Sequence, residues 1–272
     1  MNHSEDPMDN RLLAALADAD WQRWKPQLER VDLKRGQVLY EAGRHQRHAY
    51  FPTSAIVSLL YTIESGASTE FAVVGNEGVI GSSLYLGADT TTGSASVLIA
   101  GQGFRIGAQV IQDEFDRSDS VRHLLLRYTQ ALVTQIAQTA VCYRNHTIDQ
   151  QVCGWLLYSL DRLRGSEVVV TQELLASMLG VRREGVTEAV GRLQAAGLIH
   201  CTRGHIEVLD RDGLEHRSCE CHAVVKKEYD RLLPQDPAAR PAASRRWAWP
   251  ASDPAAPAHC MPQSRVAAMV QT

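Results

Sequence analysis

The chain has 272 residues, of which 44% are hydrophobic and 22% are charged, as is usual for a globular protein. This length favours two domains over one. The formal net charge of −3 excludes a chain that is basic throughout, so any contact with nucleic acid must depend on a local cluster of basic residues. The first ten residues are polar and acidic, and no apolar run approaches the length of a membrane span. We therefore expect no secretory signal, no membrane partner and a cytoplasmic location.

The residue pattern in the N-terminal part of the chain changes from helical to β-prone near residue 30. Residues 8–30 place apolar side chains at helical spacing, which predicts one or two short helices in an N-terminal segment, 1–30. From 31 to 117, short β-prone runs alternate with Gly, Asn and Asp turns. This pattern predicts an antiparallel sandwich or barrel.

A long helix is predicted over 118–145. Its apolar residues recur at a/d-like spacing, and we take the following as the predicted dimer interface: Val121, Leu125, Tyr128, Leu132 and Ile136. A narrow stripe of this kind fits a helix that pairs with its own copy. The alternative is a helix whose stripe packs on the chain's own β domain.

Residues 146–233 predict a winged helix-turn-helix domain. Helical patterns over 171–179 and from Arg182 to Ala196 meet at a turn containing Gly180, and a hairpin turning at Arg203 and Gly204 follows. The last 39 residues, 234–272, are rich in proline and alanine and predict a disordered tail.

The second of these helices carries the candidate DNA contacts. We expect Val186, Val190 and Leu193 to face the core, which leaves the N-terminal half of the helix exposed, as in a recognition helix. Arginine can bind guanine in a bidentate manner and glutamate can accept from cytosine N4, and a glycine at 185 would let the helix approach the duplex. The predicted DNA-binding residues are Arg182, Arg183, Glu184, Thr187 and Glu188, with Thr171 and Gln172 on the preceding helix and Arg203 in the wing. The alternative is a solvated helix end.

The stretch VTQELLASMLGVRREGVTEAVGRLQAAGLI, followed by RGHIEVLDRDGLE, resembles the DNA-binding domain of the cyclic-AMP receptor protein / fumarate-nitrate regulator (Crp/Fnr) superfamily of bacterial transcription factors. The resemblance covers residues 10–233 and is strongest in the last third of that range. It implies an α+β fold: a cyclic-nucleotide-binding-like β-barrel (jelly roll), a long dimerisation helix and a C-terminal winged helix-turn-helix. It also implies a homodimer on a palindromic operator, with RNA polymerase as a further partner.

The resemblance assigns roles to individual residues of the recognition helix. Arg183 and Glu184 match the family's base-contacting pair, and Arg182 and Thr187 fall near phosphates. Glu188 is a departure, because cyclic-AMP-responsive members carry an arginine there. A carboxylate only accepts hydrogen bonds, so the operator should differ from theirs.

The family's nucleotide cassette is matched only in part by VIGSSLYLGADTTTGSASVLI. Gly81 is kept, but Ser82 replaces the ribose-binding glutamate, and the arginine before Ser94 and Ala95 is lost. No Lys or Arg lies between Arg47 and Arg105, and burying a phosphate without a cation is costly. We therefore expect no cyclic AMP binding of the usual kind. A candidate pocket for another small-molecule effector remains, formed by Gly81, Ser82, Ser83, Ser94 and Ala95.

None of the six cysteines lies in the first 141 residues, where family members with iron–sulfur clusters carry theirs. RSCECH contains Cys219, Cys221 and His222, but Cys-x-Cys is a poor zinc spacing and one pair cannot fill a tetrahedral site. We expect free or structural thiols and neither metal nor cofactor. A redox-reactive pair and a metal site are the alternatives.

Function follows from these patterns. No Gly-x-Ser-x-Gly, phosphate-binding loop or His-Glu-x-x-His motif is present, so we do not expect an enzyme. The sequence predicts a sequence-specific DNA-binding transcriptional regulator. The alternative is a cyclic-nucleotide-like or redox sensory module whose helix-turn-helix contacts protein rather than DNA.

Overall fold

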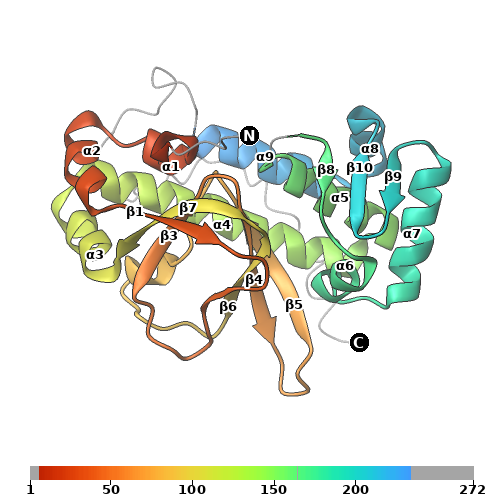
Figure 1. Ribbon diagram of the computed structural model, residues 1–272, viewed down its shortest axis with the longest axis horizontal. Helices are drawn as coiled ribbons and strands as arrows, with labels where there is room; N and C mark the ends of the chain where they lie inside the picture. The colour runs from red at the N-terminus through yellow and green to blue at the C-terminus, as the bar shows by residue number, and fades with distance from the viewer. Residues whose placement is uncertain (1–5, 164, 234–272) are drawn as a thin grey trace, which may run out of the picture. The chain divides into compact units, whose positions relative to one another are not determined.

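The computed structural model describes residues 6–163 and 165–233 (Figure 1). All of them belong to the first of two units, Met1–Pro241; the second unit is Ala242–Thr272. The tail predicted over 234–272 lies outside the described residues. The α+β class is confirmed, with a β domain, one long helix and a winged helix-turn-helix in that order.

Short helices open the described chain, and their bounds are η1 (Pro7–Asp9), α1 (Arg11–Ala14), α2 (Asp18–Trp24) and η2 (Lys25–Gln27). Buried Asn10 fixes this segment. Its carboxamide oxygen accepts from the amides of Leu12 and Leu13, which caps α1. Its Nδ2 donates to the carbonyls of Pro52 and Gly78, at 2.9 Å each. One side chain therefore joins the first helices to the β domain.

The β domain contains seven strands in two antiparallel sheets. Their bounds are β1 (Glu29–Leu33), β2 (Val38–Tyr40), β3 (His48–Pro52), β4 (Ile56–Thr62), β5 (Ser68–Val74), β6 (Ser94–Ile99) and β7 (Gly101–Gly107). One sheet has the order β1-β7-β3 and the other β2-β6-β4-β5, so among the described strands they form a jelly-roll-like pair rather than a closed barrel. Alternate side chains such as Phe51, Val57 and Ile106 are almost fully buried in the core.

Two helices follow the sheets. The first, α3 (Ala108–Arg117), lies where no helix was predicted, whereas α4 (Asp119–Asn145) occupies the place of the predicted long helix. Ser118 caps α4 by accepting from the amide of Val121. A short 3-10 helix, η3 (Ser82–Leu84), lies between β5 and β6.

The C-terminal domain begins directly after α4. Its elements are α5 (Ile148–Leu160), β8 (Glu167–Val168), α6 (Gln172–Leu179), α7 (Arg183–Ala195), β9 (Ile199–Thr202), β10 (His205–Val208), α8 (Arg211–Arg217) and α9 (Glu220–Leu232). The three strands form a sheet of order β8-β10-β9, which is the wing. The last helix, α9, packs along α4, so the chain returns to its long helix (Figure 1). None of the described helices is long and apolar enough to cross a membrane.

Candidate nucleic-acid interface

The turn between α6 and α7 depends on one cap and one glycine. The Thr171 hydroxyl accepts from the Leu174 amide at 3.2 Å and starts α6. Gly180 ends it with φ 64°, a left-handed conformation that favours glycine. Half-buried Val181 packs on the cluster between the helices. These features set the angle at which α7 leaves the turn.

The inner face of α7 is anchored as predicted. Val186 and Leu193 are fully buried and Val190 is nearly so, in one cluster with Leu175 and Leu179 of α6. Gly185 faces α5 across a short gap: a Cβ there would lie 2.6 Å from Cδ1 of Ile148, the flexible end of a side chain that would have to shift. Its expected role in the approach to DNA stays a prediction.

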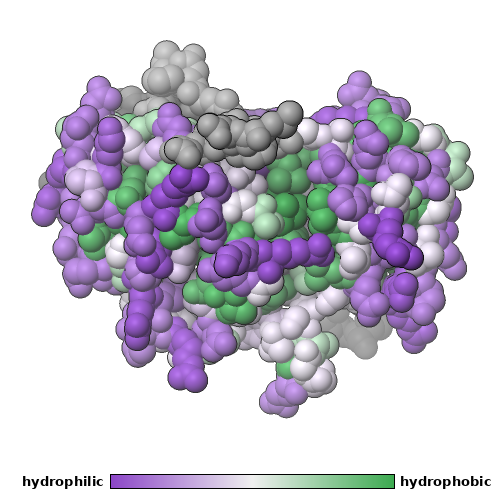
Figure 2. Space-filling view, in the orientation of Figure 1, coloured by the Kyte–Doolittle hydropathy of each residue, from purple (hydrophilic) through white to green (hydrophobic). Residues whose placement is uncertain are grey.

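The outer face of α7 contains the predicted contacts. Arg182 is the N-cap residue, and Arg183 and Glu184 form the first turn. The exposed members of the predicted set are Thr171, Arg182, Arg183, Glu184, Thr187, Glu188 and Arg203, while Gln172 is half-buried. Figure 2 shows mostly hydrophilic side chains over the α7 side of the molecule. The structure thus collects all eight residues on α6, α7 and the wing turn.

Hydrogen bonds and exposed ion pairs join several of these side chains. Thr187 Oγ1 donates to Gln172 Oε1 at 2.8 Å and so joins the two helices. Arg183 lies 3.4 Å from Glu173 Oε2, with both side chains mostly exposed. Exposed pairs of this kind contribute at most about 1 kcal/mol. The Arg183 guanidinium can therefore exchange its partner for a stronger acceptor at little cost.

A second arginine on α7 is structural rather than available. Arg192 Nη2 lies 2.5 Å from Asp149 Oδ1 on α5, and Arg192 Nη1 lies 3.6 Å from Glu188 Oε2. Hydrogen bonding to Arg192 holds the pKa of Asp149 below its usual value. Arg192 and Asp149 could not be paired from the sequence, because Asp149 lies on another helix. The Arg192–Asp149 pair lies one turn away from the predicted contacts and fixes α7 on α5.

The wing presents one cation at its tip. Arg203 is exposed in the turn between β9 and β10, and Gly204 beside it has φ 78°. His205 Nδ1, directly after this turn, lies 2.6 Å from Glu167 Oε1, which joins β10 to β8. The register His205 opposite Thr202 and Val208 opposite Ile199 keeps the two strands paired up to this turn.

The residues of the candidate effector pocket lie on η3 and β6. Gly81 has φ 102° and precedes η3, and the Ser83 hydroxyl donates to Gln46 Oε1 at 2.8 Å. Ala95 is fully buried and pairs with Leu59 of β4. The amides of Gly43 and Gln46 bond the carbonyls of Thr91 and Asp89, so the 41–47 segment lies against the 87–93 loop. Arg105 is the basic residue nearest in sequence to Ala95 of this candidate pocket. It lies on the other sheet and pairs with Glu29 at 2.7 Å.

The burial of α4 revises the predicted dimer interface. Val121, Leu125, Tyr128 and Leu132 are at most 5% exposed within the single chain. They belong to the β domain's own core cluster, and Ile136 packs partly buried against it. These residues therefore pack on the chain's own β domain, as the alternative prediction for this stripe had it. The apolar side chains that α4 leaves exposed are Leu126 at 41%, Val133 at 51% and Val141 at 46%.

These features define a class of protein: a jelly-roll-like β domain, a long helix and a winged helix-turn-helix with basic side chains at the start of its second helix. Residues 150–217 match the model of the Crp-like helix-turn-helix domain. None of the curated proteins matches the chain.

Solved structures with this fold cover most of the chain. FixK2 from Bradyrhizobium japonicum is 13% identical, covering 71% of this chain and 98% of its own, with a TM-score of 0.60. The c-di-GMP responsive global regulator CLP from Xanthomonas campestris is 16% identical over 71% and 99%, with a TM-score of 0.57. A CRP-family transcriptional regulator from Thermus thermophilus is 17% identical over 70% and 96%, with a TM-score of 0.57. The resemblance to the Crp/Fnr superfamily is thereby confirmed, in the fold of the described chain and in the Crp-like domain.

Proposed function

We propose that this protein is a transcriptional regulator that binds specific DNA with the exposed start of α7. The observation that carries the proposal is the placement of Arg182, Arg183 and Glu184 on the N-terminal turn of a helix whose opposite face is locked in the domain core. Side chains at this end of a recognition helix contact base edges in the major groove. The related structures support the same class of function, since CLP is described as a global regulator.

The chemistry of the exposed residues suggests a division of roles. Arg183 suits guanine O6 and N7, and Glu184 suits the amino group of cytosine. Arg203, at the wing tip, suits a phosphate, a contact that positions the protein without specifying sequence. Glu188 adds a second carboxylate one turn beyond Glu184, so we expect its position to favour a base that donates a hydrogen bond.

We further propose that two copies act together on a palindromic operator through α4. The exposed side chains Leu126, Val133 and Ala140 recur every seven residues, and Gln130 and Ala137 lie between them. This spacing forms an a/d seam on the face opposite the buried one. A twofold axis along such a seam would present two α7 helices to successive half-sites.

The effector of the proposed regulator is not cyclic AMP bound in the usual way. The loops around Gly81 and Ala95 contain neither Lys nor Arg, and Arg105 is engaged by Glu29. A buried phosphate would have no cation from these loops. Calorimetry with cyclic AMP should therefore show no tight binding, and binding that depends on Ser82 or Ser94 would contradict this part of the proposal.

Binding-site selection from random duplex DNA with the full chain tests the main proposal. We expect enrichment of one palindromic motif, and binding that weakens steeply as salt rises, because phosphate contacts release counterions. Failure to enrich any motif, with no salt-sensitive shift on the chain's own promoter region, would instead favour a helix-turn-helix that contacts protein.

A further inference from the structure

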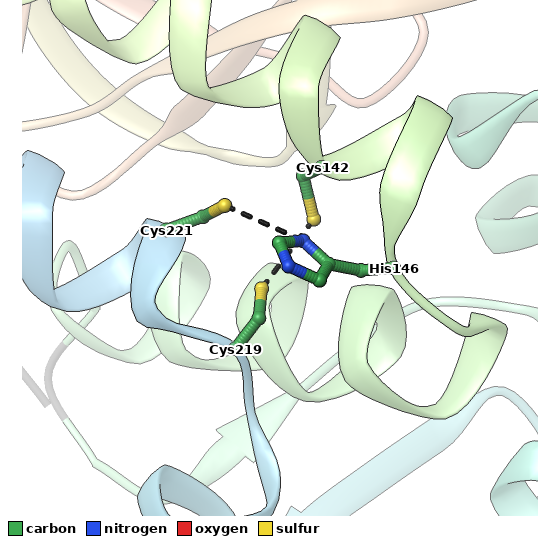
Figure 3. A group of neighbouring side chains, drawn as sticks. All are labelled: Cys142, His146, Cys219 and Cys221. Carbon is green, nitrogen blue, oxygen red and sulfur yellow. Dashed lines mark hydrogen bonds between the residues drawn. The ribbon is translucent and has the colours of Figure 1, made fainter. Parts of the chain in front are cut away.

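Three cysteines and one histidine converge where α4 ends and α9 begins (Figure 3). Cys142 lies in the last turn of α4, and His146 is its C-cap residue. Cys219 is the N-cap residue of α9, and Cys221 lies in its first turn. Figure 3 shows the four side chains pointing toward one another from these two helix ends.

The distances within this Cys142–His146–Cys219–Cys221 cluster match one tetrahedral ion. Its four ligand atoms all lie within 4.8 Å of one another. The sulfurs of Cys142 and Cys219 are 3.6 Å apart, and Cys221 Sγ is 3.6 Å from His146 Nδ1. Zinc–ligand bonds of about 2.3 Å to sulfur and about 2.0 Å to nitrogen give tetrahedral edges of about 3.8 Å between two sulfurs and about 3.5 Å between sulfur and nitrogen.

The surroundings of the cluster favour thiolates at Cys219 and Cys221 and an oriented imidazole at His146. Cys142, Cys219 and Cys221 are at most 8% exposed, and the latter two lie at the N-terminus of the 13-residue helix α9, where the helix dipole stabilises negative charge. The other ring nitrogen of His146, Nε2, lies 3.5 Å from Glu220 Oε2. A carboxylate in that position fixes the tautomer of a metal-bound histidine. The His146 side chain is 16% exposed, which leaves an approach from solvent.

We propose that this cluster is a mononuclear Cys3His metal site that binds zinc, with Cys142, Cys219 and Cys221 as thiolate ligands and His146 as the imidazole ligand through Nδ1. Three thiolates and one imidazole with no place left for water are typical of structural zinc sites.

Two other uses of the same thiols fit the geometry less well. A disulfide needs the sulfurs at about 2.05 Å, and the 3.6 Å between Cys142 and Cys219 is far longer. In a four-iron cluster each ligand binds a different iron, so the four ligand atoms would be spread around a large cofactor. Here they surround a space the size of one ion.

The position of the site gives the metal a mechanical role. One ligand pair belongs to the end of the long helix, and the other belongs to the helix that closes the DNA-binding domain. A bound ion would clamp α9 onto α4 at the point where the chain passes from α4 into α5. The same clamp would thereby hold α7 in a fixed orientation to the long helix.

Metal analysis of the full chain, purified under reducing conditions, tests the proposal. We expect one zinc per chain that persists through gel filtration. After exchange with cobalt, we expect the visible absorption bands of tetrahedral Co²⁺ with thiolate ligands. A reduced chain that binds neither ion, or that instead carries iron with inorganic sulfide, would overturn the proposal.

Ligand variants make the assignment specific. Cys219→Ser and His146→Ala should lower zinc content and alter the cobalt bands, whereas His146→Cys should restore a full site with four sulfur ligands. Cys201→Ser is the matched control, since Cys201 is a free cysteine in the wing outside the cluster. Full zinc occupancy in Cys219→Ser would count against the site. Should the variants fail to fold, the cobalt spectrum of the unaltered chain still decides whether sulfur ligands surround the ion.

Discussion

At the scale of single residues, Arg183 is the side chain on which the proposed DNA contact most depends. It is exposed, and the weak pair with Glu173 does not restrain it. We expect Arg183→Ala to lose about 1–3 kcal/mol of specific binding, roughly 5- to 150-fold in affinity, without loss of fold. The measurement is a titration of the selected operator in a mobility-shift assay. Arg44→Ala, which removes an equally charged and exposed arginine from the β domain, should bind normally. An unchanged affinity for Arg183→Ala would mean that α7 meets DNA in another register.

A second residue with a measurable effect, here on the pH dependence of stability, is Glu70 of β5. It is 3% exposed, and its carboxyl lies against Trp155 of α5. Burial raises the pKa of its carboxyl to about 7, although hydrogen bonds from Ser58 and Trp155 act to lower it. Between pH values of about 4.5 and about 7, the Glu70 carboxyl therefore keeps its proton in the folded chain and loses it in the unfolded chain. By linkage, the free energy of unfolding should fall as the pH rises from about 4.5 to about 7.

Glu70→Gln should remove this part of the pH dependence. Wild-type stability should change by about 3 kcal/mol across the window, from the difference of about 2.5 units at 1.36 kcal/mol each. The variant should lack that slope and be the more stable protein at pH 8. Urea denaturation at a series of pH values measures both. Glu64→Gln, at an exposed position, should behave like wild type; parallel curves for Glu70→Gln and wild type would refute the interpretation.

These residues differ in how visible they are in the sequence. The contacts on α7 could be predicted because helix, turn and wing follow one another between Gln172 and Val208, and local periodicity fixes which face is exposed. The Cys142–His146–Cys219–Cys221 cluster could not be, because its two pairs are separated by more than 70 residues and come together only through the packing of α9 on α4. Asp149 escaped notice for the same reason, since Arg192 reaches it from another helix.

At the scale of elements, α4 shows that periodicity predicts the presence of a helix more reliably than it predicts what the helix packs against. Apolar residues occur on two of its faces: one contains Val121 and Leu125, and the other contains Leu126 and Val133. Spacing alone could not say which face meets the β domain. The structure assigns the first face to the chain's own core and leaves the second exposed.

The exposed face of α4 leads to a prediction about assembly. Val133→Glu should convert the proposed dimer to a monomer, because two charged side chains would be buried opposite each other on the seam. Sedimentation equilibrium measures the mass directly. Ile63→Glu, which places the same charge at an exposed apolar position in the β4–β5 turn, should leave the mass unchanged. A Val133→Glu protein that retained the wild-type dimer would show that α4 is not the seam.

At the scale of the whole described unit, a buried polar network joins its two domains. Arg162, after α5, donates to Glu77 of the β domain at 2.8 Å and to Gln135 of α4 at 3.2 Å. Tyr229 of α9 donates to the same Gln135 oxygen at 3.2 Å, and the Arg162 guanidinium lies 5.9 Å from the Tyr229 ring centre. The DNA-binding domain is thus held on the β domain and on α4 by fully desolvated groups as well as by apolar packing.

The network makes Arg162 the residue whose loss should most weaken the union of the two domains. Arg162→Ala should lower the free energy of unfolding by about 3–5 kcal/mol, because it leaves the Glu77 carboxylate buried without its cation. The double variant Arg162→Met/Glu77→Gln should be less destabilised than Arg162→Ala alone, since neither charge then remains. Urea denaturation of the full chain gives these values, with Arg44→Ala as the surface control, expected within about 0.5 kcal/mol of wild type. If Arg162→Ala were no more harmful than that control, the pair would not hold the domains together, and apolar packing between α4 and α9 would have to account for the arrangement alone.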